Sequence, residues 1–550
     1  MAETPGDQAS STDLGALLAV TVEDQFRAHP ALARANGDHR ADGLLSAPGA
    51  GAHARRGREL GHLKQRLDGA SAGGDIELGL DLDWARSVVD SELFDLELRR
   101  RPFRDPNSLL DWDSPLEIGG YLLRDYAPLE VRVGGLCRQL EQAREWTEAA
   151  ISALEPELAE PLIALALEGV EGQLDFLHDE VAPVAAQLKD HRLRDRLSRA
   201  VQLGEDALAL IVAELEQRRL GANQEVALGA DNLLTMLRAQ EGLERTVGEL
   251  RQEADAELEK LGEQRDQLLT DEFGGRQFSD VRMELEQDHF AAAELIPVTA
   301  GLLEELRAFV EANADVPIPE GPSCEVRPTP GVMTAWVSAA YDSAGPLETR
   351  VLPCLYYVTT PQARWSDSEA EEWLRYLNRA TLKNSSVHEV YPGHHVQHLY
   401  TRGLRTDLRR FFWTPGFGEG WAHYAELLMV EAGLGDGDPL LRLAQNQDAM
   451  LRGCRYRAAV GIHAEGWTVE DGTRLFMDRI GMDPLPARRE ASRGTYDPLY
   501  LVYTLGKLQI LRWREDWLRS QRGDLRQFHR RVLAAGSPPL AALERWLSAN

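Results

Sequence analysis

Apolar and polar positions follow a helical period along most of the chain, which predicts a mainly α-helical protein. Between residues 129 and 217, apolar residues recur at spacings of three and four with charged residues between them, most clearly in 130–154 and 158–186. Residues 247–270 are dense in Glu, Gln, Arg, Leu and Ala, which indicates an exposed helix or half of a helical hairpin. A coiled-coil arm for a partner is the alternative for that segment. A long apolar, aromatic helix near residues 500–518 completes a large helical body.

A proline-rich stretch at residues 316–322 interrupts this pattern and marks the clearest boundary, near Glu320. It separates a mostly helical N-terminal region, residues 1–320, from a C-terminal region, residues 321–550, that carries the candidate chemistry. Helices on the two sides could also pack into one continuous body. In that case the division describes only the order of the chain.

Two segments beyond this boundary are typical of strands. Residues 331–337 and 350–359 are rich in β-branched and aromatic side chains. They predict a small β-sheet beside the helix that carries the motif described below. Within it, residues 355–359 could lie along a cleft and pair with an extended substrate.

Composition excludes several classes of function. Of the 550 residues, 43% are hydrophobic and 27% are charged, and no apolar run is long enough to cross a bilayer. The net charge of −29 argues against nucleic-acid and anionic-membrane partners. The four cysteines form no Cys-x-x-Cys pair, which argues against a disulfide framework and a cysteine zinc site. Because the first residues show no secretory signal, we expect a cytoplasmic location.

The candidate chemistry centres on a segment that begins with His388 and Glu389. Metallopeptidase helices usually carry His-Glu-x-x-His, in which two imidazoles four residues apart bind one zinc ion and the Glu is the general base. Here Pro392 occupies the position of the second His, and the next imidazoles are His394 and His395. The proline must kink or break the helix. An unbroken helix would favour His395 slightly as the second ligand, whereas a break removes that preference.

A second motif, residues 419–426, offers the third ligand. A catalytic zinc site with two histidines usually adds a carboxylate and keeps one position for water. In this motif Glu419, His423 and Glu426 share one face of the expected helix, beside an apolar run. A metal is the simplest partner for such a polar face.

On these two motifs, the sequence resembles the domain of unknown function 885 (DUF885) family, which is grouped with the zincin-like metallopeptidases. The pattern His-Glu-x-x-Pro-Gly-His followed by Gln matches residues 388–397, and Glu-Gly-Trp-Ala-x-Tyr-x-Glu matches residues 419–426. The resemblance extends more weakly over most of the chain. It implies a zincin-like active-site helix in a mainly helical fold.

The resemblance also implies roles for individual residues. It makes His388, His394 and Glu419 the ligands of one zinc ion or another divalent metal, with His395 only a neighbour of the site. It discounts His423 as a ligand, because the family position is commonly apolar. We expect Glu389 to act as the general base on a metal-activated water. Glu426 is the expected acceptor for the second N–H of a ligand imidazole.

Two further residues are candidates for stabilising the oxyanion of the reaction, His463 and Tyr503. Both lie in segments that resemble the family, although His463 could be a satisfied buried imidazole and Tyr503 could only anchor the terminal helix. The predicted function is hydrolysis of peptide or small amide substrates, in a carboxypeptidase-like manner if a cation receives the substrate's free carboxylate. A catalytically silent binding protein with the same fold is the alternative.

The sequence offers several cations for such a carboxylate and does not choose among them. They are Arg455, Arg457, Arg493 and Lys507. An ordinary ion pair is the competing interpretation for each of them.

Overall fold

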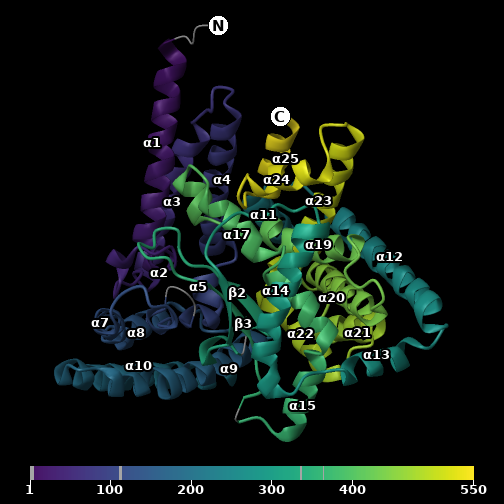
Figure 1. The fold of residues 1–550 in the computed structure, drawn as a ribbon. Helices are drawn as coiled ribbons and strands as arrows, with labels where there is room; N and C mark the ends of the chain where they lie inside the picture. The colour runs from purple at the N-terminus through teal and green to yellow at the C-terminus, as the bar shows by residue number, and fades with distance from the viewer. Residues whose placement is uncertain (1–4, 111–113, 335–336, 363, 550) are drawn as a thin grey trace. The chain divides into compact units, whose positions relative to one another are not determined.

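The computed structural model describes residues 5–110, 114–334, 337–362 and 364–549, and it confirms a mainly helical fold with a small sheet (Figure 1). The chain divides into two compact units. The first comprises Met1–Val226, Pro330–Val337 and Ala344–Leu352, and the second comprises Ala227–Thr329, Ser338–Ser343 and Pro353–Asn550. The boundary expected near Glu320 lies inside the second unit, because helices before that residue pack against helices that follow it.

The first unit is built from helices around an apolar core. Leu136, Ile163, Phe176 and Leu208 are fully buried in that core. The helical pattern predicted at 130–154 corresponds to two helices, α7 (Leu129–Leu140) and α8 (Ala143–Ala153). The pattern at 158–186 corresponds to α9 (Glu160–Phe176), followed by a π-helical turn (Leu177–Val181) and a 3₁₀ helix (Ala182–Gln187). The helices of this unit are α1 (Pro5–Ala28), α2 (Pro30–Ala35), α3 (Ala50–Asp68), α4 (Ile76–Leu93), α5 (Arg101–Arg104), α6 (Gly120–Leu123), α7 (Leu129–Leu140), α8 (Ala143–Ala153), α9 (Glu160–Phe176) and α10 (His191–Arg219).

The second unit is also helical and holds the small sheet. Its helices are α11 (Ala230–Glu241), α12 (Val247–Phe273), α13 (Phe278–Gln287), α14 (Leu295–Asn313), α15 (Asp367–Tyr376), α16 (Arg379–Glu389), α17 (His394–Arg402), α18 (Asp407–Phe411), α19 (Pro415–Glu431), α20 (Pro439–Ala464), α21 (Val469–Ile480), α22 (Pro484–Tyr496), α23 (Val502–Arg519), α24 (Leu525–Leu533) and α25 (Leu540–Ala549). No helix in the described part of the chain is both long and apolar enough to span a membrane.

Helix α12 shows how local signals and packing combine. A capping box between Thr246 and Glu249 begins it, and Gly274 ends it in a left-handed conformation with a φ of 62°. One stripe of the helix, which includes Leu250, Ala254 and Leu258, is buried, and the helix packs against α20. The segment is therefore a helix as predicted, but one of its faces is buried rather than exposed.

The strands form one sheet, of order β1-β3-β2, from β1 (Cys324–Pro328), β2 (Ala339–Asp342) and β3 (Cys354–Val358). Strand β3 is buried along its whole length, with β1 parallel to it on one side and β2 antiparallel on the other. The strand predicted at 350–359 is confirmed at its centre. Because both edges of β3 are occupied, the suggestion that this segment pairs with substrate is wrong.

The strand predicted at 331–337 is also wrong. Gly331–Met333 forms a short 3₁₀ turn after Pro330, and the hydroxyl of Thr334 donates a hydrogen bond to the Gly331 carbonyl at 2.9 Å. Such local side-chain bonds compete with strand pairing. Two residues of the predicted strand, 335 and 336, lie outside the described residues, and β2 begins only at Ala339.

Candidate metal centre

The helix that carries the first motif is interrupted. Helix α16 ends at Glu389, residues 390–393 are non-helical, and α17 begins at His394. Pro392 has no N–H to donate within a helix, which explains the break. Consequently His388 lies in the last turn of one helix, and His394 opens the next.

Gly393 is needed at this break because the chain passes very close to the preceding helix. A Cβ atom at this position would lie 1.7 Å from the carbonyl oxygen of His388, which no side chain can tolerate. This close approach brings the imidazoles of His388 and His394 together, with ring centroids 5.0 Å apart and ring planes nearly perpendicular, at 89°. The break thus brings the two imidazoles close together, as a spacing of four residues does for the two histidines of His-Glu-x-x-His in an uninterrupted helix.

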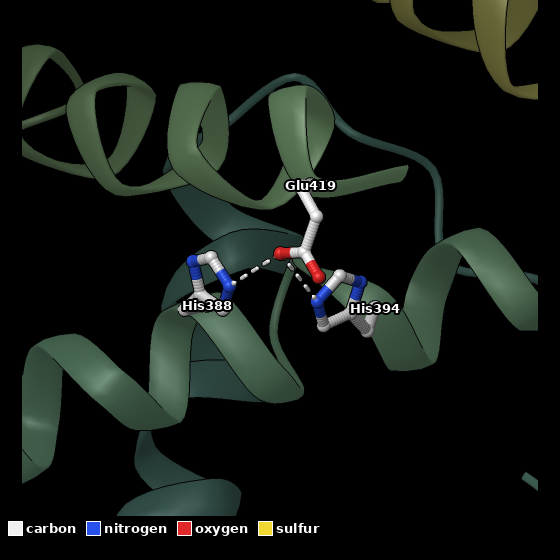
Figure 2. Close-up of side chains that lie close together, drawn as sticks. All are labelled: His388, His394 and Glu419. Atoms are coloured by element: carbon white, nitrogen blue, oxygen red, sulfur yellow. Dashed lines mark ion pairs between the residues drawn. The ribbon is translucent and has the colours of Figure 1, made fainter. Parts of the chain in front are cut away.

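The carboxylate of Glu419, from α19, completes a triad with the two imidazoles (Figure 2). Its Oε2 atom lies 3.4 Å from Nε2 of His388 and 3.5 Å from Nε2 of His394. The three ligand atoms lie within 4.8 Å of one another. The side chains of His388, His394 and Glu419 are only 6%, 14% and 16% exposed.

The triad fits a divalent metal ion by a direct test. Oε2 of Glu419 is buried and has no hydrogen-bond partner among the described residues. A buried carboxylate oxygen without a partner is costly. The two imidazoles hold the pKa of Glu419 below its usual range in spite of burial, so the carboxylate is charged. Two imidazoles and one carboxylate are also the donor set of catalytic zinc sites.

The second ring nitrogen of His388 is fixed by Glu426, as expected from the sequence. Nδ1 of His388 lies 2.7 Å from Oε1 of Glu426, a fully buried carboxylate on α19. When this imidazole is neutral, the N–H is on Nδ1 and a lone pair on Nε2 faces Oε2 of Glu419. A lone pair and a carboxylate oxygen face each other stably only with a cation or a proton between them. Burial lowers the pKa of His388, but Glu419 and Glu426 outweigh burial and raise it to about 9.

Three residues around Glu426 were missed by the sequence interpretation. The Arg452 guanidinium lies 3.0 Å from Oε1 of Glu426, and the amide of Asn384 donates to Oε2 at 3.0 Å and to Asp448 at 2.6 Å. Burial raises the pKa of Asp448 to about 6. Asn384 could have been found, because it precedes His388 by one helical turn. Arg452 and Asp448 come from α20 and carry no local signal.

The predicted general base, Glu389, is oriented by the sheet. The backbone N–H of Tyr341, in the edge strand β2, donates a hydrogen bond to Oε2 of Glu389 at 2.9 Å. In the described part of the chain no donor contacts the other carboxylate oxygen, Oε1. One oxygen of Glu389 is therefore held in place while the other remains available.

The sequence profile of the family described as "Bacterial protein of unknown function (DUF885)" matches residues 30–547. The chain belongs to the DUF885 family. This DUF885 chain is similar to the solved structure of a putative lipoprotein of unknown function from Shewanella oneidensis, with a TM-score of 0.78, 20% identity, and coverage of 97% of this chain and 99% of that one. It is also similar to a putative lipoprotein from Colwellia psychrerythraea, with a TM-score of 0.82, 18% identity and 98% coverage of both chains. A comparison with curated proteins gave no match.

His395 of the DUF885 chain faces a different environment from His394. Its Nδ1 lies 3.2 Å from the hydroxyl of Tyr341, and its ring meets that of Tyr391 edge-on, with centroids 5.4 Å apart. It lines a cavity of about 690 Å³ together with residues of α14 and β1. The slight preference for His395 that an unbroken helix would give does not apply, because the helix does not continue across residues 390–393.

Tyr503 is brought beside the triad by a close helix contact. A Cβ atom at Gly420 of α19 would lie 2.6 Å from the backbone of Gly506 in α23, so the two helices touch through their glycines. The ring of Tyr503 consequently stacks on that of His388, with centroids 6.4 Å apart and an angle of 20°. Burial and the negative charge of Glu419 raise the pKa of Tyr503, so its hydroxyl keeps its proton.

His463 does not join this group. Its Nε2 lies 2.7 Å from the carbonyl oxygen of Gly494, and its Nδ1 accepts from the N–H of Leu228 at 3.3 Å. Both ring nitrogens are therefore engaged by backbone in a buried position, which leaves no donor for a substrate. The predicted oxyanion role of His463 is replaced by the alternative, a satisfied buried imidazole. His423, which the family resemblance discounted, is likewise absent from the triad.

Proposed function

We propose that this DUF885 chain is a metal-dependent hydrolase of peptide or small amide bonds. The observation that carries the proposal is the buried Oε2 of Glu419, which lacks a hydrogen-bond partner among the described residues and lies between the Nε2 atoms of His388 and His394. In this proposal the three residues hold one zinc ion, or another divalent metal, in a zincin-like centre.

A divalent cation at this place would lower the pKa of a water molecule and polarise the carbonyl of a substrate. Glu389 is the base that takes a proton from the attacking water. Its Oε2 is held by the N–H of Tyr341, so Oε1 is the atom that accepts the proton and later delivers it to the leaving amine. Arg452 and Asn384 keep Glu426 in place, and Glu426 keeps the ring of His388 oriented.

Tyr503 serves as the donor to the developing oxyanion. Its raised pKa keeps the phenol protonated at neutral pH, and its ring lies parallel to that of His388. A substrate in extended conformation would lie along β2, the edge strand, rather than along the enclosed β3. The strand that orients the base would then also orient the scissile bond.

The test combines metal analysis with cleavage of a peptide library by the native protein and by Glu389→Gln. The native protein should contain one metal ion per chain and cleave peptides. Glu389→Gln should retain the metal and lose roughly 10²- to 10⁴-fold in turnover, because only the proton acceptor is changed. Stoichiometric metal without cleavage of any peptide would favour the catalytically silent binding protein instead.

The predicted cytoplasmic location remains open to test. The two solved structures are described as putative lipoproteins, a statement about those proteins. Fractionation of cells that express the native gene, followed by detection of the chain in each fraction, decides between a cytoplasmic and a membrane-attached protein.

A further inference from the structure

Two arginines of the second unit lie next to Tyr503. The guanidinium carbon of Arg455 is 5.8 Å from the centroid of the Tyr503 ring. Nη2 of Arg493, in the last turn of α22, lies 3.5 Å from the Tyr503 hydroxyl. Tyr503 in turn stacks on His388, a residue of the triad.

Arg455 is fully committed to another residue. Its Nε and Nη2 atoms each lie 2.8 Å from a different oxygen of Glu490, and its side chain is 11% exposed. A bidentate pair of this kind is strong. Lys507 is even less available, since it is 2% exposed and lies 2.7 Å from Glu257. Breaking either buried pair to receive a ligand would leave a buried charge without a partner.

Arg493 is held much more loosely. Its Nε and Nη2 atoms share a single oxygen of Asp497, at 3.3 Å and 3.1 Å. The two side chains are 27% and 30% exposed, and a pair four residues apart at the end of a helix contributes little stability. A guanidinium has five N–H donors, and in the described part of the chain no acceptor contacts Nη1. Arg493 can therefore receive a ligand without disrupting a buried pair.

We propose that Arg493 binds the C-terminal carboxylate of a peptide substrate, an inference that rests on the proposed hydrolase. A planar guanidinium matches a carboxylate with two parallel hydrogen bonds. Tyr503 marks where the scissile carbonyl lies in the proposed function, and Arg493 is within contact distance of its hydroxyl. Because an extended residue spans at most about 3.6 Å, the carboxylate then belongs to a residue one or two positions after the scissile bond. The enzyme removes residues from the C-terminus.

The first experiment compares kcat/KM for matched peptides with a free or an amidated C-terminus, using the metal-loaded native protein, Arg493→Gln, Arg493→Lys and Arg488→Gln. Arg488 is the control, since it lies on the same helix, is 63% exposed and pairs with Glu470 at 3.5 Å. Loss of a hydrogen bond to a charged group predicts that Arg493→Gln lowers the preference for free over amidated peptide roughly 10- to 100-fold. Arg493→Lys should keep part of the preference, and Arg488→Gln all of it. Equal cleavage of both peptides by the native protein would overturn the proposal.

A second measurement separates this inference from the proposed function. Calorimetric binding of the same peptides to Glu389→Gln, with and without Arg493→Gln, needs no turnover. Weaker binding of only the free peptide supports the assignment even if the native protein cleaves nothing, whereas unchanged binding overturns it. An amidated peptide that ends in Glu identifies the source of the carboxylate. If it binds as well as the free peptide, a side-chain acid rather than the C-terminus is recognised, and the assignment is wrong.

Discussion

The first unit places an imidazole between two carboxylates, and the second unit places a carboxylate between two imidazoles. In the first, Nδ1 of His39 lies 3.3 Å from Asp42 and Nε2 lies 3.0 Å from Glu348. In the second, Oε2 of Glu419 lies 3.4 Å and 3.5 Å from the two ring nitrogens. The same residue types thus form two groups of inverse composition.

The difference lies in what completes each group. The group around His39 is complete without a metal ion, because each ring N–H of the charged imidazole has its own carboxylate within hydrogen-bond distance. In the second group, Oε2 of Glu419 has no hydrogen-bond partner in the described part of the chain. Histidine and acid side chains close together therefore do not by themselves indicate a metal. The proposed metal site rests instead on an oxygen that has no hydrogen-bond partner and lies between two ring nitrogens.

The largest effect is expected when one carboxylate in each group is changed. Glu419→Gln removes a ligand charge and should lower zinc affinity by more than about 100-fold, the upper end of what loss of an outer partner costs. Glu348→Gln, its counterpart beside His39, should leave zinc binding unchanged. Zinc per chain is measured by mass spectrometry after gel filtration. A full zinc ion retained by Glu419→Gln would refute the ligand assignment.

A smaller effect is expected from the partner of His388. Glu426→Gln keeps the size of the side chain but removes the charge that holds Nδ1 of His388 and pairs with Arg452. Zinc affinity should fall about 10- to 100-fold. Glu431→Gln is the matched control, because Glu431 lies on the same helix, is 42% exposed and pairs with Arg514. Competition against a chromophoric chelator gives both affinities, and equal values would show that Glu426 does not support the site.

The smallest effect concerns His39, whose two ring nitrogens each lie within hydrogen-bond distance of a carboxylate. Burial lowers the pKa of His39, but its bonds with Asp42 and Glu348 outweigh burial and raise it to about 9. The charged form therefore stabilises the folded state fully below pH 6.5, and this contribution is lost as the pH rises through about 9. At about 1.4 kcal/mol per pKa unit, the rise from 6.5 to about 9 corresponds to at most about 3.5 kcal/mol, and less because water reaches the side chain.

Urea unfolding between pH 6 and 9.5 measures this loss. The free energy of unfolding of the native protein should fall over that range more steeply than that of His39→Gln. Parallel curves for the two proteins would show that the group contributes no pH dependence.

Much of the fold could be predicted from the sequence because helices give a regular spacing of apolar residues. The patterns at 130–154 and 500–518 correspond to helices, and a capping box marks the start of α12. The sheet was less accessible. Strand β1 has only Val326 as a strongly apolar residue next to a proline-rich stretch, and the apparent strand at 331–337 begins as a turn. Strands depend on distant partners, which a single sequence does not identify.

Some residues of the candidate site could likewise be predicted from the sequence, and others could not. Residues within a motif, such as His394 and Glu419, could be proposed from family resemblance, and the structure places them together. Arg452 could not be proposed, because only packing of α20 brings it to Glu426. His463 was misassigned since its sequence neighbourhood resembles the family, whereas its backbone contacts depend on segments more than 30 residues away.

The contact between Gly393 and the carbonyl of His388 has a consequence for anyone who transfers such a centre to another scaffold. A continuous helix with histidines grafted six positions apart would present them on different faces. The graft must carry the proline and the side-chain-free residue as a unit, since replacing the latter by alanine would force the two imidazoles apart. A search of sequence collections for similar centres should likewise weight that residue as heavily as the histidines themselves.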